Sequence, residues 1–310
     1  MTSAFERTKS NSEETLATLR ETLASIVPSD AVALTCGSYA RREATSGSDL
    51  DFFILSPTAV DEDAPWFVAA QEAINKIVTK APATGGAFDA MTPMDELLVK
   101  AGGDQDVNKN ITRRMLYLLE GEHLTNKEKF DEIRRRILTQ YAEETPQDHQ
   151  IALYLLNDII RYWRTVTVDY SYKTNESGKP WAVRNIKLVF SRKLMYASGL
   201  FSVAMTADRT LSRKIDKLEE LFSMPALERL IEICGVGRTK RLRESYEFFL
   251  EQIDIPEVRT KLETLSKDKR EEDDTFRALK NEGHRFTREL MSVFEATFHS
   301  THPIYRAMVF

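Results

Sequence analysis

Strand-like segments occur only in the first third of this sequence, and helical patterns fill the rest. AVALT (31–35) and LDFFILS (50–56) are short, apolar and bounded by polar residues, so we expect two strands with a turn and a short helix between them. A third strand is expected within TGGAFDAMTP (84–93). Helices are expected over 12–26 and 66–78, where apolar residues recur at helical spacing. The pattern predicts an α+β fold, in which strands and helices are combined in the N-terminal part.

Beyond about residue 110 the apolar residues recur every three to four positions, as on one face of a helix. A chain of 310 residues exceeds what one core usually serves. The polar, proline-terminated stretch 143–146 is typical of a linker, so we expect an α+β domain over 1–145 and an all-helical C-terminal domain over 146–310. The helices are expected at 110–120, 127–141, 148–168, 183–204, 211–222, 226–233, 239–252, 257–280 and 284–298.

Composition narrows the class of protein. With 42% hydrophobic and 29% charged residues the chain is typical of soluble globular proteins, and its net charge of −5 argues against binding nucleic acid through overall charge. Two cysteines, Cys36 and Cys234, are too few for a disulfide framework or a thiolate zinc site, so we expect a cytoplasmic protein. The N-terminal residues lack the apolar core of a secretory signal, and no apolar run is long enough to predict a membrane span.

Two carboxylates, Asp49 and Asp51, stand at the start of the second expected strand. Side chains two residues apart on a strand project from the same face, about 7 Å apart. Carboxylates this close repel each other, and a shared cation relieves the repulsion. Because Mg²⁺ binds through one or two carboxylates together with substrate phosphates, the pair predicts a magnesium site. The alternative is that the two acids only form a turn before the strand.

Gly37 and Ser38 follow the first expected strand. Glycine lets a ligand approach the backbone closely, and a helix beginning here would direct N–H groups at phosphate oxygens. Gly-Ser is also a common loop pair, so this feature alone indicates little. Together with the two acids on the adjoining strand, it predicts a site for phosphoryl transfer.

The stretch GSYARREATSGSDLD resembles the signature of the DNA polymerase β-like nucleotidyltransferase superfamily. Its Ala-Arg and Glu before Ser-Asp-Leu-Asp are most similar to the protein-PII uridylyltransferase type and its uncharacterised relatives. The resemblance covers residues 36–55 specifically and extends over the expected α+β domain. It implies that this is the catalytic domain, with a nucleotidyltransferase-type mixed sheet and flanking helices. The residues that carry it are Gly37, Ser38, Arg41, Glu43, Ser48, Asp49, Leu50 and Asp51.

The resemblance implies transfer of a nucleoside monophosphate from a nucleoside triphosphate to an acceptor hydroxyl, with release of pyrophosphate. It implies that Gly37 and Ser38 contact the β and γ phosphates, and that Asp49 and Asp51 bind two Mg²⁺ ions. The family usually adds a third carboxylate, a metal ligand and base for the acceptor, from a neighbouring strand. Asp89 is the expected third catalytic and metal-binding acid.

Two other acids, Asp104 and Asp106, compete with Asp89 for the place of the third carboxylate. The metal-dependent phosphohydrolase domain of full-length uridylyltransferases carries a His-Asp doublet, whereas this sequence has only the reverse order, Asp148-His149. A hydrolytic reversal of the reaction is therefore not expected. Assignment of the PII protein as the acceptor is correspondingly open.

The segment from Arg161 to Lys193 contains eight cations against two acids, and the aromatic residues Tyr162, Trp163, Tyr170, Tyr172 and Trp181 are interleaved with them. Arg184 and Lys187 are three residues apart and would share a helical face, and with Arg41 they are the expected nucleotide-binding cations. The segment could instead bind a nucleic-acid acceptor, or form a helix pair with a solvated basic face. The sequence leaves these alternatives open.

The sequence identifies a type of reaction and leaves the acceptor open among a protein, a small molecule and RNA. It does not distinguish UTP from ATP or CTP, and it leaves the oligomeric state open. Two other functions compete with a uridylyltransferase-like enzyme. One is a nucleotide-sensing or partner-binding module with weak catalysis, and the other is a toxin-like or antibiotic-modifying transferase that acts on tRNA or an aminoglycoside.

Overall fold

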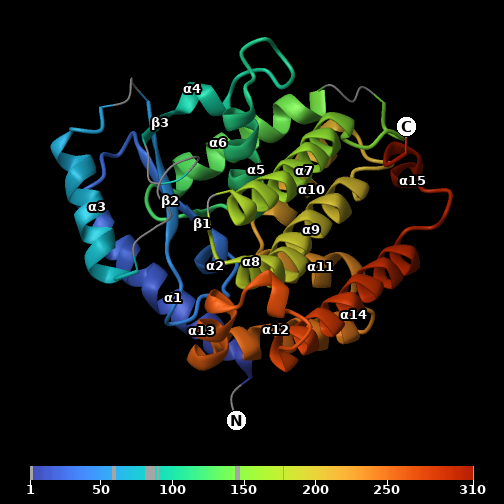
Figure 1. Ribbon diagram of the computed structural model, residues 1–310. Coiled ribbons are helices and arrows are strands. Elements are labelled where there is room, and N and C mark those ends of the chain that lie inside the picture. The colour runs from blue at the N-terminus through green and yellow to red at the C-terminus, as the bar shows by residue number, and fades with distance from the viewer. Residues whose placement is uncertain are drawn as a thin grey trace.

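A mixed sheet lies on one side of the molecule and helices fill the other side (Figure 1). The computed structural model describes residues 3–57, 61–80, 88, 91–143, 147–176 and 178–309. Within these residues the sheet has four strands in the order β3-β2-β1-β4. The α+β fold expected from the sequence is confirmed.

The centre of the sheet is the antiparallel pair β1 (Val32–Cys36) and β2 (Asp51–Ser56), in which Cys36 lies opposite Asp51. The parallel neighbour of β2 is β3 (Met91–Pro93), which forms the end of the third strand expected over 84–93; of the rest of that range the structure describes only Phe88, outside the strand. The other neighbour of β1 is β4 (Glu122–His123), which sequence analysis missed because two residues carry no alternation pattern.

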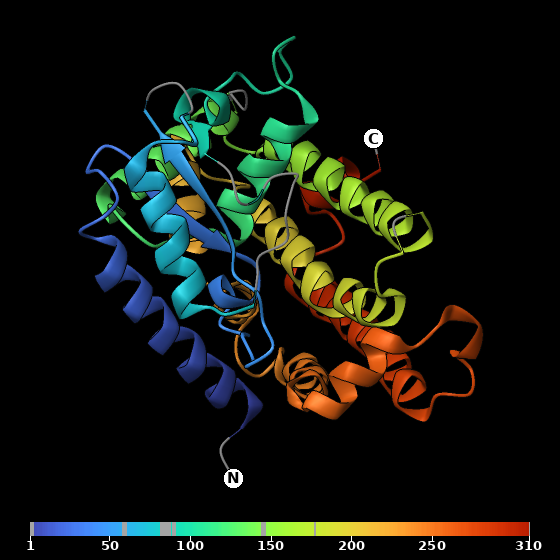
Figure 2. The ribbon, with the colours of Figure 1, turned by 60° about the vertical axis from the view of Figure 1, so that its left-hand side comes forward.

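Both faces of the sheet are buried. Ala33, Phe52 and Ile54 pack on one face against α1 (Ala4–Leu23) and α3 (Pro65–Ile77), which lie together in Figure 2. The opposite face carries Leu34 and Phe53. That second face is covered by α5 (Asn108–Glu120) and α6 (Lys127–Glu143), and the short helices α2 (Gly37–Ala40) and α4 (Met94–Leu97) complete this part.

The helix expected over 12–26 begins earlier, at Ala4. Ser3 accepts a hydrogen bond from the N–H of Glu6 at 3.2 Å, and the Glu6 carboxylate accepts from the N–H of Ser3 at 2.9 Å. This reciprocal capping satisfies two N–H groups that would otherwise be unpaired. A polar cap therefore starts α1 well before its apolar repeat becomes regular.

The C-terminal part is helical, as expected, and none of the described helices is long and apolar enough to cross a membrane. The segment expected as one helix over 183–204 contains a π-helical turn at Leu188–Arg192. The helices are α7 (Leu153–Asn175), α8 (Trp181–Lys187), α9 (Lys193–Ala204), α10 (Leu211–Phe222), α11 (Ala226–Cys234), α12 (Lys240–Asp254), α13 (Pro256–Thr264), α14 (Asp274–Thr297) and α15 (Pro303–Ala307).

The prediction of one helix over 257–280 is wrong. The chain forms α13, then a 3₁₀ turn at Lys267–Lys269, and a new helix begins at Asp274. The carboxylate of Asp273 accepts a hydrogen bond from the N–H of Phe276 at 2.7 Å and so caps the new helix. The charged residues before it offer no apolar face to bury, so packing does not hold them in a helix.

One hydrophobic core crosses the expected boundary near residue 145. It runs from Leu34 in β1 through Leu116 in α5 and Leu155 in α7 to Phe286 in α14. Because the helical part packs directly on helices that cover the sheet, the two parts share their main core. The division of the chain into a domain over 1–145 and a second domain over 146–310 remains a proposal.

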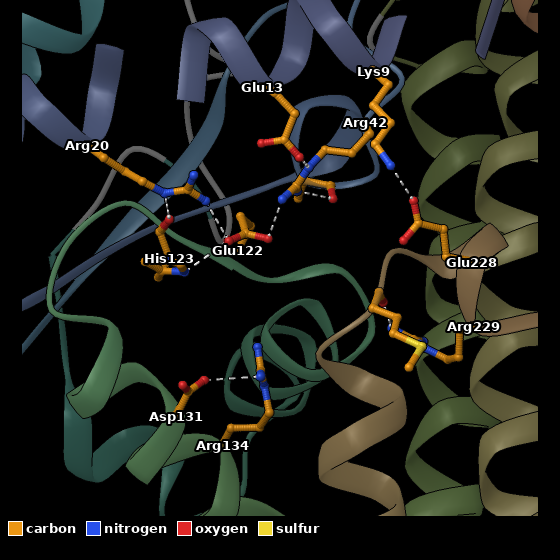
Figure 3. A network of polar contacts seen from close by, with 12 residues as sticks. Lys9, Glu13, Arg20, Arg42, Glu122, His123, Asp131, Arg134, Glu228 and Arg229 are labelled. Atoms are coloured by element: carbon orange, nitrogen blue, oxygen red, sulfur yellow. Dashed lines mark hydrogen bonds and ion pairs between the residues drawn. The ribbon is translucent and has the colours of Figure 1, made fainter. Parts of the chain in front are cut away.

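A network of charged residues joins the turn between β1 and β2 to α1 and β4 (Figure 3). Arg42 adopts φ 63°, a left-handed conformation that costs a non-glycine residue energy. Its guanidinium donates to Glu13 at 2.7 Å and to Glu122 at 2.9 Å, while Arg20 donates to Glu122 at 2.7 Å. These contacts hold the strained turn against α1 and β4.

Glu122 is the centre of this network and allows a test of its contribution to stability. Burial alone would raise the pKa of Glu122, but the hydrogen bond from His123 and the charges of Arg42 and Arg20 lower it from 4.5 to about 2. A folded-state pKa below the unfolded value stabilises the protein above about pH 4.5, and the contribution disappears as pH falls towards 2. Its upper limit is on the order of 3 kcal/mol.

We therefore expect Glu122→Gln to lower the free energy of unfolding at pH 7, and the deficit to shrink steadily between pH 4.5 and pH 2. Urea unfolding at several pH values measures this. Glu132→Gln is the control, because its ion pair with Lys129 is surface-exposed and contributes little. A Glu122→Gln deficit that does not change with pH would contradict the electrostatic role.

Candidate active site

A cavity of about 330 Å³ lies between the end of the β1–β2 pair and the C-terminal helices. One wall comes from the N-terminal part and is acidic, with Asp49, Asp51 and Glu120. The other wall comes from the helical part and is basic. The polar and aromatic residues that line it are Gly37, Ser38, Arg41, Glu43, Thr45, Ser48, Asp49, Asp51, Phe88, Thr112, Glu120, Tyr162, Thr165, Asp169, Lys173, Lys187, Ser191, Arg192, Phe249 and Arg259.

Asp49 and Asp51 both line the cavity, but they do not share a strand. β2 begins at Asp51, and Asp49 lies in the loop before it, so the expected common strand face is wrong. Burial, followed by the charges of Asp49 and Glu120, raises the pKa of Asp51 to about 7. The acids are therefore close enough to repel one another, as the sequence analysis expected.

Gly37 lies directly against Asp51. It adopts φ 74°, and a Cβ atom at this position would stand 2.8 Å from Oδ2 of Asp51. Only glycine meets both conditions at once, because it tolerates positive φ and leaves space for the carboxylate. The expected helix after Gly37 is present as the single turn α2, which carries Ser38 on the cavity wall.

Arg41 lines the cavity, but its guanidinium is bound by carboxylates of the protein. It donates to Glu43 at 2.9 Å and also to Glu120. Burial opposes the charge, and Glu43 and Glu120 outweigh it, so the pKa of Arg41 is raised. The hydroxyl of Tyr246 donates to Glu43 at 2.6 Å. Arg41 thus fixes the turn to α5 and α12, and its expected contact with nucleotide stays a prediction.

Glu120 is a cavity residue that sequence analysis missed. It is the last residue of α5, buried beside Arg41, and its charge contributes to the raised pKa of Asp51. The only sequence signal was an acid at the end of the apolar run MLYLLE before Gly121. That signal does not place Glu120 in the cavity, because its position there depends on where α5 ends relative to the sheet.

Lys187 faces the acids across the cavity. Burial and the neighbouring cation Arg259 lower its pKa to about 8, although Asp49 acts in the opposite direction. Arg184, expected on the same face, does not line the cavity, and burial lowers its pKa as well. The structure therefore brings Lys187 to the acids and leaves Arg184 outside the wall.

The π-helical turn at Leu188–Arg192 adds two more residues to the basic wall. Residues five apart on an α-helix are separated by about 140° around the axis, whereas a π turn brings them nearly into line. Lys187, Ser191 and Arg192 consequently all line the cavity. Nothing in the sequence pattern distinguishes this turn from regular helix.

The expected third carboxylate, Asp89, lies outside the described residues. Of its competitors, Asp106 forms a buried ion pair with Arg114 at 2.7 Å and Asp104 is exposed, and neither lines the cavity. Among the described residues no three potential metal ligands form a cluster. The identity of the third acid therefore stays a prediction.

The basic segment from Arg161 to Lys193 divides between several environments. Lys173, Lys187 and Arg192 line the cavity. Arg161 instead pairs with Asp158 at 3.1 Å, and the ring of Trp163 stacks on Tyr196. The segment thus contributes some residues to the cavity wall and others to contacts within the helical part, and its expected contact with nucleotide stays a prediction.

Comparison with known proteins adds one finding. Residues 16–144 match the family model of a nucleotidyltransferase domain. The matched region contains Gly37, Ser38, Asp49, Asp51 and Glu120, the acidic wall of the cavity. It supports the nucleotidyltransferase superfamily and a general transfer of nucleoside monophosphates. No curated protein matches the chain, so the similarity to the uridylyltransferase type stays a prediction.

The contact between Gly37 and Asp51 can be tested by substitution. Gly37→Ala adds the cost of a left-handed alanine, about 1 kcal/mol, and also a clash with the carboxylate. Gly102→Ala is a matched control, because Gly102 has φ 78° and a Cβ there would meet nothing within 4 Å. We expect urea unfolding to show a larger loss of stability for Gly37→Ala. Equal losses would contradict the close approach.

Proposed function

We propose that the protein is a Mg²⁺-dependent nucleotidyltransferase of the EC 2.7.7 type, which moves a nucleoside monophosphate from a nucleoside triphosphate to an acceptor hydroxyl and releases pyrophosphate. The observation that carries the proposal is the meeting of Asp49, Asp51 and the Gly37-Ser38 turn in one cavity opposite Lys187. The match of this region to a nucleotidyltransferase domain supports it. The uridylyltransferase-like character and the cytoplasmic location are part of the proposal.

The donor set of the cavity fits magnesium. Asp49 and Asp51 offer hard carboxylate oxygens, and a bound cation would offset the burial and the neighbouring negative charges that raise the pKa of Asp51. Two ions are proposed, held by Asp49, Asp51 and Asp89, with the remaining positions taken by phosphate oxygens and water. When bound, they would supply positive charge at the reacting phosphate and at the leaving pyrophosphate.

The chain's own residues position the reactants. Gly37 and Ser38 would contact the β and γ phosphates, because Gly37 has no side chain and leaves the backbone beside Asp51 open to a ligand. Lys187 and Arg192 would bind phosphate oxygens from the opposite wall. Asp89 would accept the proton of the acceptor hydroxyl. The acceptor oxygen then bonds to the α phosphorus as the bond to the bridging oxygen breaks, and pyrophosphate departs.

Substitution of the acids tests the proposal. We expect the Asp49→Asn/Asp51→Asn double variant to lose pyrophosphate release from Mg²⁺ and nucleoside triphosphate, because both metal-binding carboxylates are gone. Its thermal unfolding should stay nearly unchanged or improve, since mutual repulsion is removed. Asp104→Asn, at an exposed acid outside the cavity, is the control. Release by the double variant at the wild-type rate would refute the assignment.

The same assay can distinguish the nucleotide and the acceptor. ATP, UTP, CTP and GTP are each offered with proteins, RNA and small molecules carrying free hydroxyls, and mass spectrometry detects a covalent nucleotide adduct. Calorimetric binding of a nucleoside triphosphate without an adduct on any acceptor would instead favour a nucleotide-sensing module.

Lys187 gives a second test, through affinity. We expect Lys187→Met to weaken calorimetric binding of the Mg²⁺–triphosphate complex at least tenfold, as for loss of a charge-assisted contact. Lys179→Met, at an exposed lysine of the same basic segment, should bind as the wild type does. Because the pKa of Lys187 is about 8, wild-type affinity should fall as pH rises above 8. If Lys187→Met shows the same fall, another group is responsible.

A further inference from the structure

A second cavity, of about 410 Å³, lies between α8, α14 and the segment that precedes α14. Trp181 and Asn185 of α8 line it. Asn185 and Lys187 are two residues apart and therefore point about 200° apart around the helix. The second cavity consequently lies on the opposite side of α8 from the candidate active site, and no residue of the proposed reaction takes part in it.

The lining of the second cavity is basic in a chain whose net charge is −5. Arg270, Arg277 and Lys280 face it against one acid, Glu271. The two arginines have exposed acidic neighbours, since Arg270 pairs with Glu271 at 3.1 Å and Arg277 pairs with Asp274 at 2.5 Å. An arginine in such an exposed pair can bind a competing anion in place of its acidic neighbour, because each pair contributes little to stability.

Lys280 has no such neighbour. Its ammonium group is partly buried and donates to Oδ1 of Asn185 at 3.0 Å, while Nδ2 of Asn185 donates to the hydroxyl of Tyr170 at 2.9 Å. In the described part of the chain Lys280 forms no ion pair with a carboxylate. The lysine is held in place by neutral partners, and its charge is left without a counterion.

A second amine increases this excess of positive charge. Lys193 of α9 is also partly buried, and its Nζ donates to Oγ1 of Thr287 on α14 at 2.7 Å. Burial lowers the pKa of both lysines, and the charge of Lys280 lowers that of Lys193 further. Two partly buried like charges without an acid are costly, and a bound anion would offset that cost.

Trp181 supplies a flat wall beside these charges. Its ring packs against the buried ring of Phe276, with the centroids 5.0 Å apart, which fixes its orientation. The indole is only partly covered and lines the cavity. An aromatic ring next to cations is the combination that binds a base by stacking and its phosphate by charge.

We propose that this second cavity binds a nucleotide, with the base on Trp181 and the phosphate at Lys280. The nucleotide could be a free molecule or one unit of a single-stranded RNA, since both present the same chemistry. Binding itself does not depend on the proposed transferase activity. Use of the cavity to hold an RNA acceptor does rest on that activity.

Fluorescence titration of the full-length protein tests this, in buffer with a chelator so that Mg²⁺-dependent binding does not contribute. The probes are AMP and a single-stranded hexamer of adenylate. We expect both to quench tryptophan emission saturably, and Trp181→Leu to remove the quenching, although Trp66 and Trp163 remain. Lys280→Met should weaken binding at least tenfold. Lys129→Met, at a lysine on α6, should bind as the wild type does.

The outcomes separate the possibilities. A hexamer that binds at least tenfold more tightly than AMP identifies an RNA strand as the ligand, and similar affinities identify a free nucleotide. The Asp49→Asn/Asp51→Asn variant should bind both probes normally, so loss of catalysis leaves this result intact. Absence of saturable binding, or equal affinity in Lys280→Met and the wild type, would overturn the proposal. Lys280 is partly exposed, so its variant keeps the test valid if Trp181→Leu fails to fold.

Discussion

The buried ion pairs of Arg41 hold together the three parts of the molecule that meet at the cavity. Its guanidinium binds Glu43 in the turn after β1 and Glu120 at the end of α5, and Tyr246 of α12 donates to Glu43. Loss of one partner of a buried pair leaves an uncompensated charge, at a cost of about 3–5 kcal/mol. The turn that carries Gly37 is thereby fixed to α5 through Glu120 and to α12 through Tyr246.

That arrangement places acids on one wall of the cavity and cations on the other. Burial raises the pKa of Asp51 to about 7 although Lys187 and Arg41 act to lower it, and burial lowers the pKa of Lys187 to about 8 although Asp49 acts to raise it. A protein selected for stability alone would pair or replace such groups. Their persistence in one cavity is typical of a site that binds charged ligands.

Sequence reasoning succeeded where structure is local. The apolar periodicity placed β1, β2 and most helices, and the spacing of Gly37, Ser38, Asp49 and Asp51 indicated one site. It failed at 257–280, where a new cap at Asp273 breaks the helical pattern, and at the two-residue strand β4. It also expected Asp49 and Asp51 on one strand, whereas hydrogen bonding with β1 begins only at Asp51.

The sequence by itself determined the two central strands, most of the helices, and the association of Asp49 and Asp51 with the Gly37-Ser38 turn, because each depends on residues close together in the chain. Only the tertiary structure decided which distant groups line the cavity with them. Glu120 enters the cavity because α5 ends beside β1, and Lys187 and Arg192 line it because α8 and the π turn after it lie across from the acids. These placements follow from packing between elements far apart in sequence, and periodicity within one element carries no information about them.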